Sequence, residues 1–387
     1  MNKKKIISSI VIFSLFFLMF ISIGESTIFQ ISSIETLENE TFYVGGTGPN
    51  NYSSIQDAID NADDWDLIYV YDDSSPYYES LFIDKRISIF GEERDSTVII
   101  GNESGYVINV IDTSLYIKDI SVKNGYRGIC QYSSDDDRNV FFVMDNCDIS
   151  DNELGLKISM TEEIIIRNSI FQNNSRGGCS ITDYCTKATI FNCTFLYNKE
   201  IYYDKALHYD CKYFGDLEIY DCRFENNTVG ISLSTNKANI YNNIIKNNMD
   251  GILIHWSFGN FLMPFRKILI QNNLFENNGD GGDFQSGGII IQDTMRCVLI
   301  QNNIFQNNNG VGVYCLRSML NTIVQNNFIN NSYNAFLFTS LFQDWDSNYW
   351  DDWGGEGPYG IMGYFSLFFE YYNYDYNPAK EPYDIGI

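Results

Sequence analysis

The sequence predicts an all-β solenoid, a parallel β-helix in which short strands recur once per coil. The first observation is a repeated phrase, since IQNNLFENN at residues 270–278 returns as IQNNIFQNN at residues 300–308. The second is the period: apolar-x-Asn/Asp-x-x-apolar recurs from residue 117 to residue 329, and from residue 146 the Asn/Asp positions lie 21 to 30 residues apart, as in solenoids. The third is that apolar residues form short β-branched and aromatic bursts, without helical spacing.

Residues 1–26 are predicted to be a signal peptide or an uncleaved N-terminal anchor, followed by a linker over residues 27–42. Three lysines, Lys3 to Lys5, precede the apolar run Ile6–Ile23, which is the order of a secretion signal. We therefore expect an exported protein, extracellular or at the cell surface. Its contact with a membrane would be confined to this segment.

Residues 43–66 are predicted to close the first coil, because the terminal coils of a solenoid would otherwise expose apolar edges. Ser54 and Asp57 form a plausible capping box, and Ile55, Ala58 and Ile59 make one apolar face of a short helix. We expect this helix to plug the open end of the tube.

Residues 67–342 are predicted to form the β-helix itself. Each coil lies on the coil below, so Ile300 and Phe305 are expected to point into the lumen and to cover Ile270 and Phe275. The polar residue between them is expected at a bend, in the left-handed backbone conformation that asparagine tolerates, bonded to turn backbone and to neighbouring amides. This expected structural ladder comprises Asn146, Asn168, Asn192, Asp221, Asn242, Asn272, Asn302 and Asn326.

Residues 343–387, dense in aromatic residues, glycine and proline, are predicted to form a C-terminal cap. An alternative interpretation is an exposed aromatic platform for sugar rings, built on Trp345, Trp350 and Trp353. Both alternatives stay open from the sequence alone.

Composition narrows the class of partner. The formal net charge is −25, so nucleic acid is not expected as a partner, because its binding requires a basic surface. Nine cysteines are present, without a CxxC metal-binding spacing. Cys147, Cys193 and Cys222 each follow a bend residue and are interpreted as small packed side chains, with a Cys193–Cys222 disulfide as the alternative.

Three long insertions follow the bend phrase and are expected to project from one flank, where they would serve binding. They span residues 198–216, 254–267 and 279–288. Tyr202, Tyr203 and Trp256 are candidates for contacting carbohydrate. Asp280 and Asp283 are candidates for holding a cation, with calcium the one cofactor considered.

Copper binding would require clustered histidine, methionine or cysteine. The chain has two histidines, His208 and His255, and Asp210 is close to the first in sequence. Both histidines are expected in the long, variable part of a coil, about 10 Å apart along the axis because one coil separates them. They are metal candidates only with loop movement.

Four segments together carry a family resemblance: YVGGTGPNNYSSIQDAID at residues 43–60, the IxNNxFxNN coils, NYWDDW at 348–353 and NPAKEPYDI at 377–385. With them the chain resembles the right-handed parallel β-helix proteins of the pectate-lyase-like superfamily. It is most similar to archaeal members of the NosD (periplasmic copper-binding) type and to carbohydrate-binding and sugar-hydrolysis repeat proteins. The resemblance implies a pectin-lyase-like fold, but several activities, because these coils serve lyases, hydrolases, adhesins and accessory proteins.

The first functional hypothesis is a non-catalytic exported protein that binds carbohydrate or another cell-surface component through its flank. The alternative is a polysaccharide lyase or glycoside hydrolase. Lyases of this fold resemble one another in having an acidic calcium cluster beside an arginine or lysine base. The run 135–137, flanked by Arg127 and Arg138, is interpreted as a charged surface loop instead. The second alternative is a copper-handling accessory protein of the NosD type.

Overall fold

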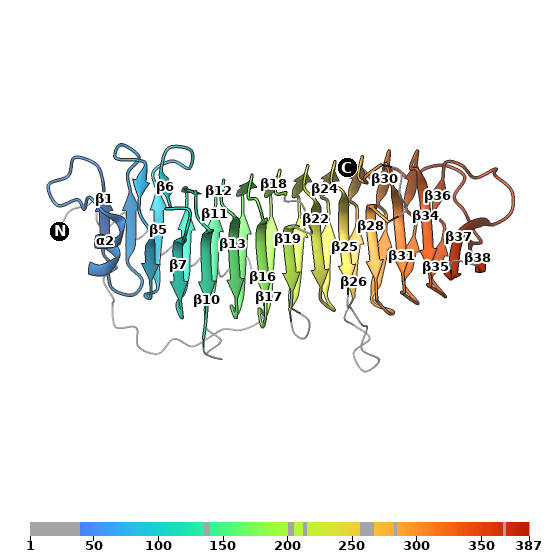
Figure 1. The fold of residues 1–387 in the computed structure, drawn as a ribbon, viewed down its shortest axis with the longest axis horizontal. Helices are drawn as coiled ribbons and strands as arrows, with labels where there is room; N and C mark the ends of the chain where they lie inside the picture. Colours follow the sequence, from blue (N-terminus) through green and yellow to red (C-terminus); the bar gives the residue numbers. More distant parts are fainter. Residues whose placement is uncertain are drawn as a thin grey trace.

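The structure is a computed structural model that describes residues 39–134, 140–199, 205–211, 215–255, 267–281, 285–366 and 369–386. Within these residues the chain is a β-solenoid whose strands form three sheets along one long axis (Figure 1). All but the last strand pair are parallel, with each strand pairing with its counterparts in the coils before and after. The predicted all-β solenoid is therefore the observed fold.

Each coil contributes one strand to each sheet, and the strands are short because corners interrupt them. Sheet A contains β1 (Thr41–Val44), β2 (Leu67–Val70), β5 (Ile87–Gly91), β8 (Leu115–Lys118), β11 (Phe141–Asp145), β14 (Glu163–Arg167), β17 (Lys187–Phe191), β20 (Asp216–Tyr220), β23 (Ala238–Tyr241), β26 (Ile268–Gln271), β29 (Val298–Gln301), β32 (Thr322–Val324) and β35 (Asp344–Asp346). Sheet B contains β3 (Tyr77–Tyr78), β6 (Val98–Ile100), β9 (Ser121–Lys123), β12 (Asp148–Ser150), β15 (Ile170–Gln172), β18 (Thr194–Leu196), β21 (Arg223–Glu225), β24 (Ile244–Lys246), β27 (Leu274–Glu276), β30 (Ile304–Gln306), β33 (Asn327–Ile329) and β36 (Tyr349–Trp350).

Sheet C has the longest strands of the coils and provides the broadest face. It contains β4 (Leu81–Ile83), β7 (Tyr106–Ile111), β10 (Arg127–Tyr132), β13 (Leu154–Ser159), β16 (Gly177–Thr182), β19 (Lys205–Asp210), β22 (Val229–Ser234), β25 (Asp250–His255), β28 (Gly287–Gln292), β31 (Val311–Leu316), β34 (Tyr333–Phe338), β37 (Tyr359–Ser366) and β38 (Phe369–Asp375). Its last two strands, β37 and β38, are antiparallel.

The short helix α2 (Ile55–Asn61) contacts β1, β2 and β4 at the N-terminal end of the tube. The Ser54 side chain accepts a hydrogen bond from the Asp57 amide at 3.3 Å, and Ile55 and Ile59 are buried. Among the residues that the structure describes, no helix has the length and apolar character needed to cross a membrane. The predicted signal or anchor segment, residues 1–26, lies outside them.

The lumen is filled by side chains that repeat at the same register. Ile300 pairs with Ile270 and Phe305 with Phe275, as predicted, and the two phenylalanine rings stack with centroids 4.7 Å apart. The column continues through Phe328, whose ring lies 4.9 Å from that of Phe305. Burial of such rings removes large apolar areas from water and is the main source of stability in the tube.

The corners carry the left-handed residues that the sequence predicts. The seven residues of the expected ladder from Asn146 to Asn302 have φ between 51° and 57°. The eighth, Asn326, does not have a positive φ. Asn272 and Asn302 are vertical neighbours, since the amide of Asn272 donates to the Asn302 carbonyl at 2.9 Å. Their side chains, however, are at least partly exposed.

The continuous buried ladder lies one residue later than expected. The Asn303 side chain donates to Asn326 Oδ1 at 3.0 Å and accepts from Asn273 Nδ2 at 3.0 Å, and all three are fully buried. Asn326 is thus a true member, aligned with Asn303 and not with Asn302. The reason is geometric: a left-handed corner turns its own side chain outward and the next one inward, where backbone carbonyls need donors.

A second ladder runs along the next corner, again with each amide donating to the amide of the following coil. Its members are Asn152, Asn174, Asn198, Asn227, Asn248, Asn278, Asn308 and Asn331. Cys193 and Cys222 continue the first ladder, where their thiols face the Ile166 and Ile190 carbonyls at 3.6 Å. All nine cysteines are buried free thiols, so the alternative Cys193–Cys222 disulfide is not formed.

Candidate functional site

Two of the expected sugar-binding tryptophans are core residues. Trp345 is 3% exposed and Trp350 is 1% exposed. The Trp350 ring stacks between Phe328 and Tyr359 at 4.3 and 4.2 Å, which extends the lumen column into the C-terminal end. Trp353 is partly buried against the same core. The alternative of an exposed platform is therefore wrong for Trp345 and Trp350, because both side chains are buried.

Several other candidates lie outside the described residues, namely Tyr202, Tyr203, Trp256 and Asp283. Asp280 is described and exposed, and its backbone amide donates to Ser286 Oγ at 2.9 Å, as in a turn. The part of the chain that the structure describes holds no group of three or more His, Cys, Asp or Glu side chains placed for a metal ion. Calcium thus stays a prediction with no assembled ligands among these residues.

The two histidines lie on regular strands of sheet C, not in the variable loops where they were expected. His208 is on β19 and pairs with Ser232 of β22, whereas His255 is on β25 and pairs across from Gln292. His255 Nε2 lies 3.3 Å from Ser232 Oγ, and Ser232 is the register partner of His208, so β22 separates the strands that carry the two histidines. Asp210 follows at the end of β19. Copper binding by these histidines stays a prediction with no assembled group of three ligands among the described residues.

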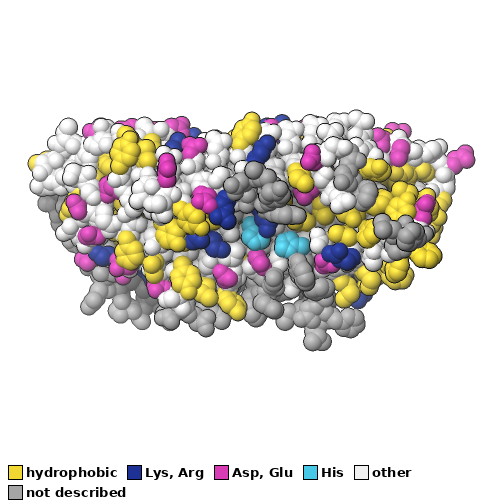
Figure 2. Space-filling model, in the orientation of Figure 1, with side chains coloured by type: hydrophobic (Ala, Val, Ile, Leu, Met, Phe, Trp, Pro, Cys, Tyr) yellow, Lys and Arg dark blue, Asp and Glu magenta, His cyan; other side chains and the backbone are white. Residues whose placement is uncertain are grey.

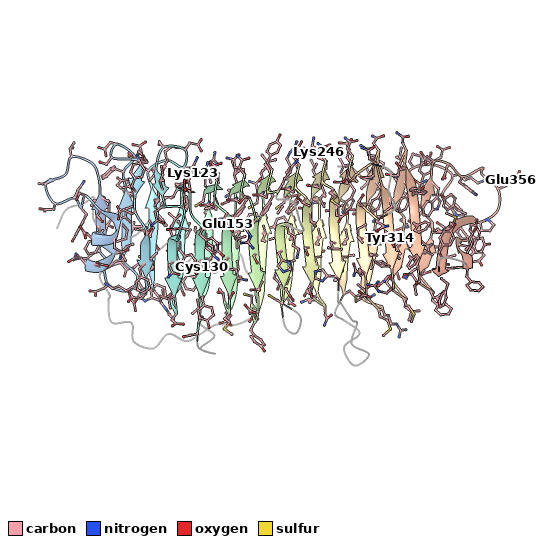
Figure 3. The ribbon with its side chains drawn as sticks, in the orientation of Figure 1. Lys123, Cys130, Glu153, Lys246, Tyr314 and Glu356 are labelled. Carbon is pink, nitrogen blue, oxygen red and sulfur yellow. The ribbon has the colours of Figure 1, made fainter. Side chains whose placement is uncertain are left out.

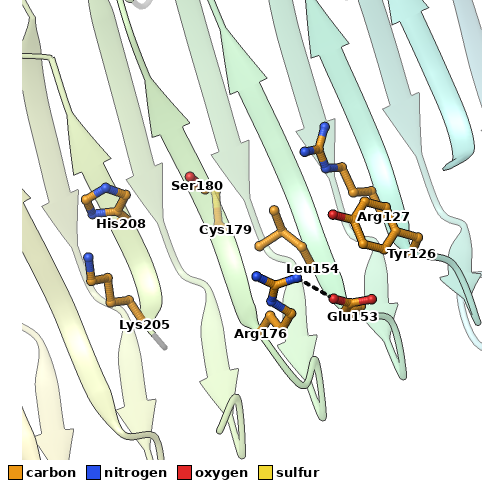
Figure 4. A pocket seen from close by; sticks show the side chains of 9 residues that line it. All are labelled: Tyr126, Arg127, Glu153, Leu154, Arg176, Cys179, Ser180, Lys205 and His208. Carbon is orange, nitrogen blue, oxygen red and sulfur yellow. Dashed lines mark hydrogen bonds and ion pairs between the residues drawn. The ribbon is translucent and has the colours of Figure 1, made fainter. Parts of the chain in front are cut away.

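A groove of about 250 Å³ opens on the outer face of sheet C between β10 and β19 (Figure 4). Its lining consists of Tyr126, Arg127, Glu153, Leu154, Arg176, Cys179, Ser180, Lys205 and His208. The hollow arises at β16, whose outward positions carry small residues. Gly177 pairs with Lys205, and Ser180 pairs with His208. Larger side chains on the neighbouring strands therefore form its walls.

The groove is basic in an acidic protein. Four of its lining residues are Arg127, Arg176, Lys205 and His208, against one carboxylate, Glu153, while the whole chain has a net charge of −25. Figure 2 shows Lys, Arg and His side chains gathered in the middle of this face. A basic cleft on an acidic surface focuses a positive potential on one place.

Local contacts hold two of the guanidinium groups. Arg127 lies over the Tyr106 ring at 5.2 Å and over the Tyr126 ring at 5.6 Å, which are cation–π distances. Arg176 Nη1 lies 2.6 Å from Glu153 Oε1 (Figure 4). These contacts position the planar groups at the groove.

Lys157 on β13 stands beside the groove, between Cys130 and Ser180 in the register of sheet C. Its Nζ donates to Thr182 Oγ1 at 2.5 Å. Burial lowers the pKa of Lys157 below its ordinary value, and the positive charge of Arg127 acts in the same direction. The lysine thus gives up its proton more readily than an exposed lysine.

Beyond the histidines the same face becomes apolar. Ser232 pairs with Leu253, which pairs with Ile290, and Ile290 pairs with Tyr314. Tyr314, Ile290 and Phe336 form a hydrophobic cluster separate from the lumen. Figure 3 marks Glu153 beside the groove and Tyr314 toward the C-terminal end, and Figure 2 shows hydrophobic side chains over that part.

Sequence reasoning missed this groove. Arg127 was assigned only to the flank of an acidic run, and Lys157, Arg176 and Lys205 were not singled out. The sequence carries one signal for this groove, since a basic residue lies near the start or middle of several strands of sheet C. The alignment of these residues with one another follows only from the strand pairing of sheet C.

Solved structures with a similar fold are remote in sequence. The A-module of the mannuronan C-5 epimerase AlgE6 of Azotobacter vinelandii is 14% identical, with 76% of this chain and 88% of that chain covered and a TM-score of 0.46. The PL6 family alginate lyase AlyGC is 14% identical over 85% of this chain and 56% of that chain, with a TM-score of 0.45. The Family 28 exopolygalacturonase of Yersinia enterocolitica is 9% identical over 84% and 78%, with a TM-score of 0.42.

Sequence profiles give the family. The profile described as "Right handed beta helix region" matches residues 68–263, more than half of the chain, and the profile "Periplasmic copper-binding protein (NosD)" matches residues 201–359. No curated protein sequence matches significantly. Together with the stacked parallel sheets, these matches show that the chain belongs to the right-handed β-helix family, and residues 201–359 are similar to the NosD proteins.

Proposed function

We propose that this protein binds an anionic polysaccharide along the outer face of sheet C. The observation that carries the proposal is the basic groove of Arg127, Arg176, Lys205 and His208 on a chain with a net charge of −25. An acidic protein repels polyanions over most of its surface, so a basic groove is the place where one can approach. A guanidinium binds a carboxylate through two parallel hydrogen bonds, so acidic sugars are the preferred occupants.

The dimensions of the face suit an extended chain. Arg127, Arg176 and Lys205 come from or adjoin β10, β16 and β19. The first and the last of these strands are three coils apart, about 14 Å along the axis at about 4.8 Å per coil. A polysaccharide lying along this axis would meet a new strand with every coil. The aromatic and aliphatic side chains beyond His255 would then contact the less polar faces of its sugar rings.

We also propose that the protein is exported. The segment 1–26 has the order of a secretion signal, and the NosD profile over residues 201–359 is described as periplasmic. Polysaccharides of cell envelopes and of the surroundings are found in these compartments. Export and a carbohydrate-binding face thus support one another.

Calorimetric titration with uronate oligomers, compared with neutral glucan oligomers of equal length, tests the binding function. We expect binding of the uronate alone. The double variant Arg127→Gln, Arg176→Gln should weaken it at least about tenfold, because each lost charged hydrogen bond contributes about 1.5–3 kcal/mol. The matched control is Arg223→Gln on sheet B, which should bind like the unaltered protein. Equal binding of both oligomers, or an unaffected double variant, would refute the proposal.

A second candidate is catalysis on the same polysaccharide, which the lowered pKa of Lys157 favours. A guanidinium at the uronate carboxylate would acidify the adjacent ring proton, and Lys157 in its deprotonated form would accept that proton. The bond to the linking oxygen would then break, that oxygen would take a proton, and a ring double bond would form. The ultraviolet absorbance of this unsaturated product tests the step. Lys157→Met should abolish it while uronate binding persists, whereas no product from the unaltered protein would leave binding as the function.

A further inference from the structure

The last strand of sheet C is an uncovered edge. β38 (Phe369–Asp375) pairs antiparallel with β37 and is the terminal strand of its sheet within the described residues. Its sequence, FEYYNYD, contains neither the lysine nor the proline that usually blunt edge strands. Such an edge presents unpaired backbone donors and acceptors to any strand that can align with it.

Among the described residues, four of the other five sheet ends contact a further element. Helix α2 contacts β1, β2 and β4 at the N-terminal end. At the C-terminal end β35 contacts β38, and Tyr349 of β36 forms a bridge with Ala379 of the tail. Among the described residues β38 is paired with a strand on one side only, the side of β37, and on this strand the Tyr374 amide donates to Asn373 Oδ1 at 2.9 Å.

The outer face of this edge is aromatic. Tyr372, Tyr374 and Tyr376 are 49%, 39% and 71% exposed, and their neighbouring rings lie 6.4 and 5.7 Å apart. Tyr372 pairs with Met362 of β37, which packs on the apolar cluster of Tyr314 and Phe336. The exposed rings thus continue an apolar surface, and aromatic residues are enriched where proteins meet.

The strands β37 and β38 themselves carry little charge. The charged residues of β37 and β38 are Glu370 and Asp375, and Asp375 is fully buried, where it accepts hydrogen bonds from Asn348 and Trp350. Two chains of net charge −25 repel one another over most of their surfaces. They approach most favourably through the C-terminal end of sheet C.

We propose that two copies of this chain associate through β38, antiparallel and about a two-fold axis, so that sheet C continues from one copy into the other. Tyr372 is the central residue of the strand, and a two-fold axis near it brings the two Tyr372 side chains together. The contact is self-complementary: the backbone edge of each copy satisfies that of the other, and the tyrosine faces pair. The solenoid of the dimer is twice as long, and the basic groove of each copy lies on the same continuous sheet C.

Cysteine cross-linking tests the geometry, because all nine native cysteines are buried and an introduced thiol is the accessible one. With glutathione disulfide as oxidant, two Tyr372→Cys chains should join through one disulfide while glutathione is reduced. We expect a covalent dimer on a non-reducing gel. The control is Tyr78→Cys, an exposed tyrosine of β3 near the N-terminal end, which should give no covalent dimer because its position lies outside the β38 contact. Equal cross-linking of both variants would overturn the proposal.

Sedimentation equilibrium of the unaltered protein supplies the second measurement. We expect a concentration-dependent dimer that the double variant Tyr372→Lys, Tyr374→Lys weakens at least tenfold. The control variant Tyr78→Lys, Phe82→Lys, at similarly exposed residues near the other end, should dimerise normally. Circular dichroism melting shows that each variant is folded. A monomer at every soluble concentration, or a dimer that tolerates both lysines, would refute association through β38.

Discussion

Replacing Asn303 by leucine tests the inward amide ladder, which we expect to be worth several kcal/mol per member. The Asn303 side chain donates to the Ile270 carbonyl at 2.9 Å and to Asn326 Oδ1 at 3.0 Å. It accepts from the backbone amide and from Nδ2 of Asn273, both at 3.0 Å. Leucine has a similar volume but satisfies none of these groups.

The magnitude follows from the groups left without a partner. Each buried donor or acceptor that loses its hydrogen bond costs about 1–3 kcal/mol. The backbone amide of Asn273 and the Ile270 carbonyl both lose a bond, and two amide groups of neighbouring coils lose a partner. We therefore expect the free energy of unfolding to fall by about 3–5 kcal/mol, offset only in part by the burial of leucine.

Urea unfolding, followed by circular dichroism, measures the change. The control is Asn302→Gly, one residue earlier, because glycine adopts φ of 53° without strain and the Asn302 side chain is outside the buried ladder. We expect this variant to lie within about 0.5 kcal/mol of the unaltered protein. If Asn302→Gly destabilised as much as Asn303→Leu, the assignment of the ladder to the second asparagine would be wrong.

Three further outcomes are expected. Phe305→Ala should lower the free energy of unfolding by about 3–5 kcal/mol in the same urea assay, because the ring is fully buried between Phe275 and Phe328; a change below about 1 kcal/mol would contradict the stacked lumen. Burial raises the pKa of Asp250 to about 7, so the folded state holds a proton that the unfolded state loses near pH 4. Its contribution to stability is present at low pH and is lost as pH rises from about 4 to about 7; Asp250→Asn should flatten this fall in urea midpoints measured across that range, and an unchanged slope would contradict it. Uronate binding should weaken steeply between low and moderate salt, because the groove acts by charge, and calorimetry that finds no salt dependence would count against it.

The fold could be predicted from the sequence because its period and its luminal residues are local patterns. The spacing between Ile300 and Phe305 is the same as that between Ile270 and Phe275, so it indicates the register of the coils whatever the length of the intervening loop. The ladder was predicted one residue too early because the pair Asn302–Asn303 offers two equal amides. Aligning Phe328 with Phe305 would have resolved it, since that places Asn326 level with Asn303.

The groove could not be predicted in the same way, because it depends on contacts between coils. Arg127, Arg176 and Lys205 are separated by loops of different length, so their convergence requires the strand pairing of sheet C. The burial of the tryptophans was missed for a different reason, a local pattern that is misleading. Trp350 reads as a surface aromatic in a tail rich in glycine, yet it occupies the position of Phe328 one coil later.

The strand register also explains how one coil can carry a binding site without weakening the tube. On β16 the residues Cys179 and Ile181 are buried in the core cluster, whereas Ser180 is partly exposed and lines the groove. Outward residues do not contribute to the stacked core, because successive side chains of a strand point to opposite faces of the sheet. A small outward residue therefore leaves a hollow on the surface and reduces the buried apolar area of the core very little. Neighbouring strands present Lys205 and Leu154 at the rim of that hollow. Charge and shape on sheet C are thus set by outward residues, while stability is set by the inward ones, and each can change alone.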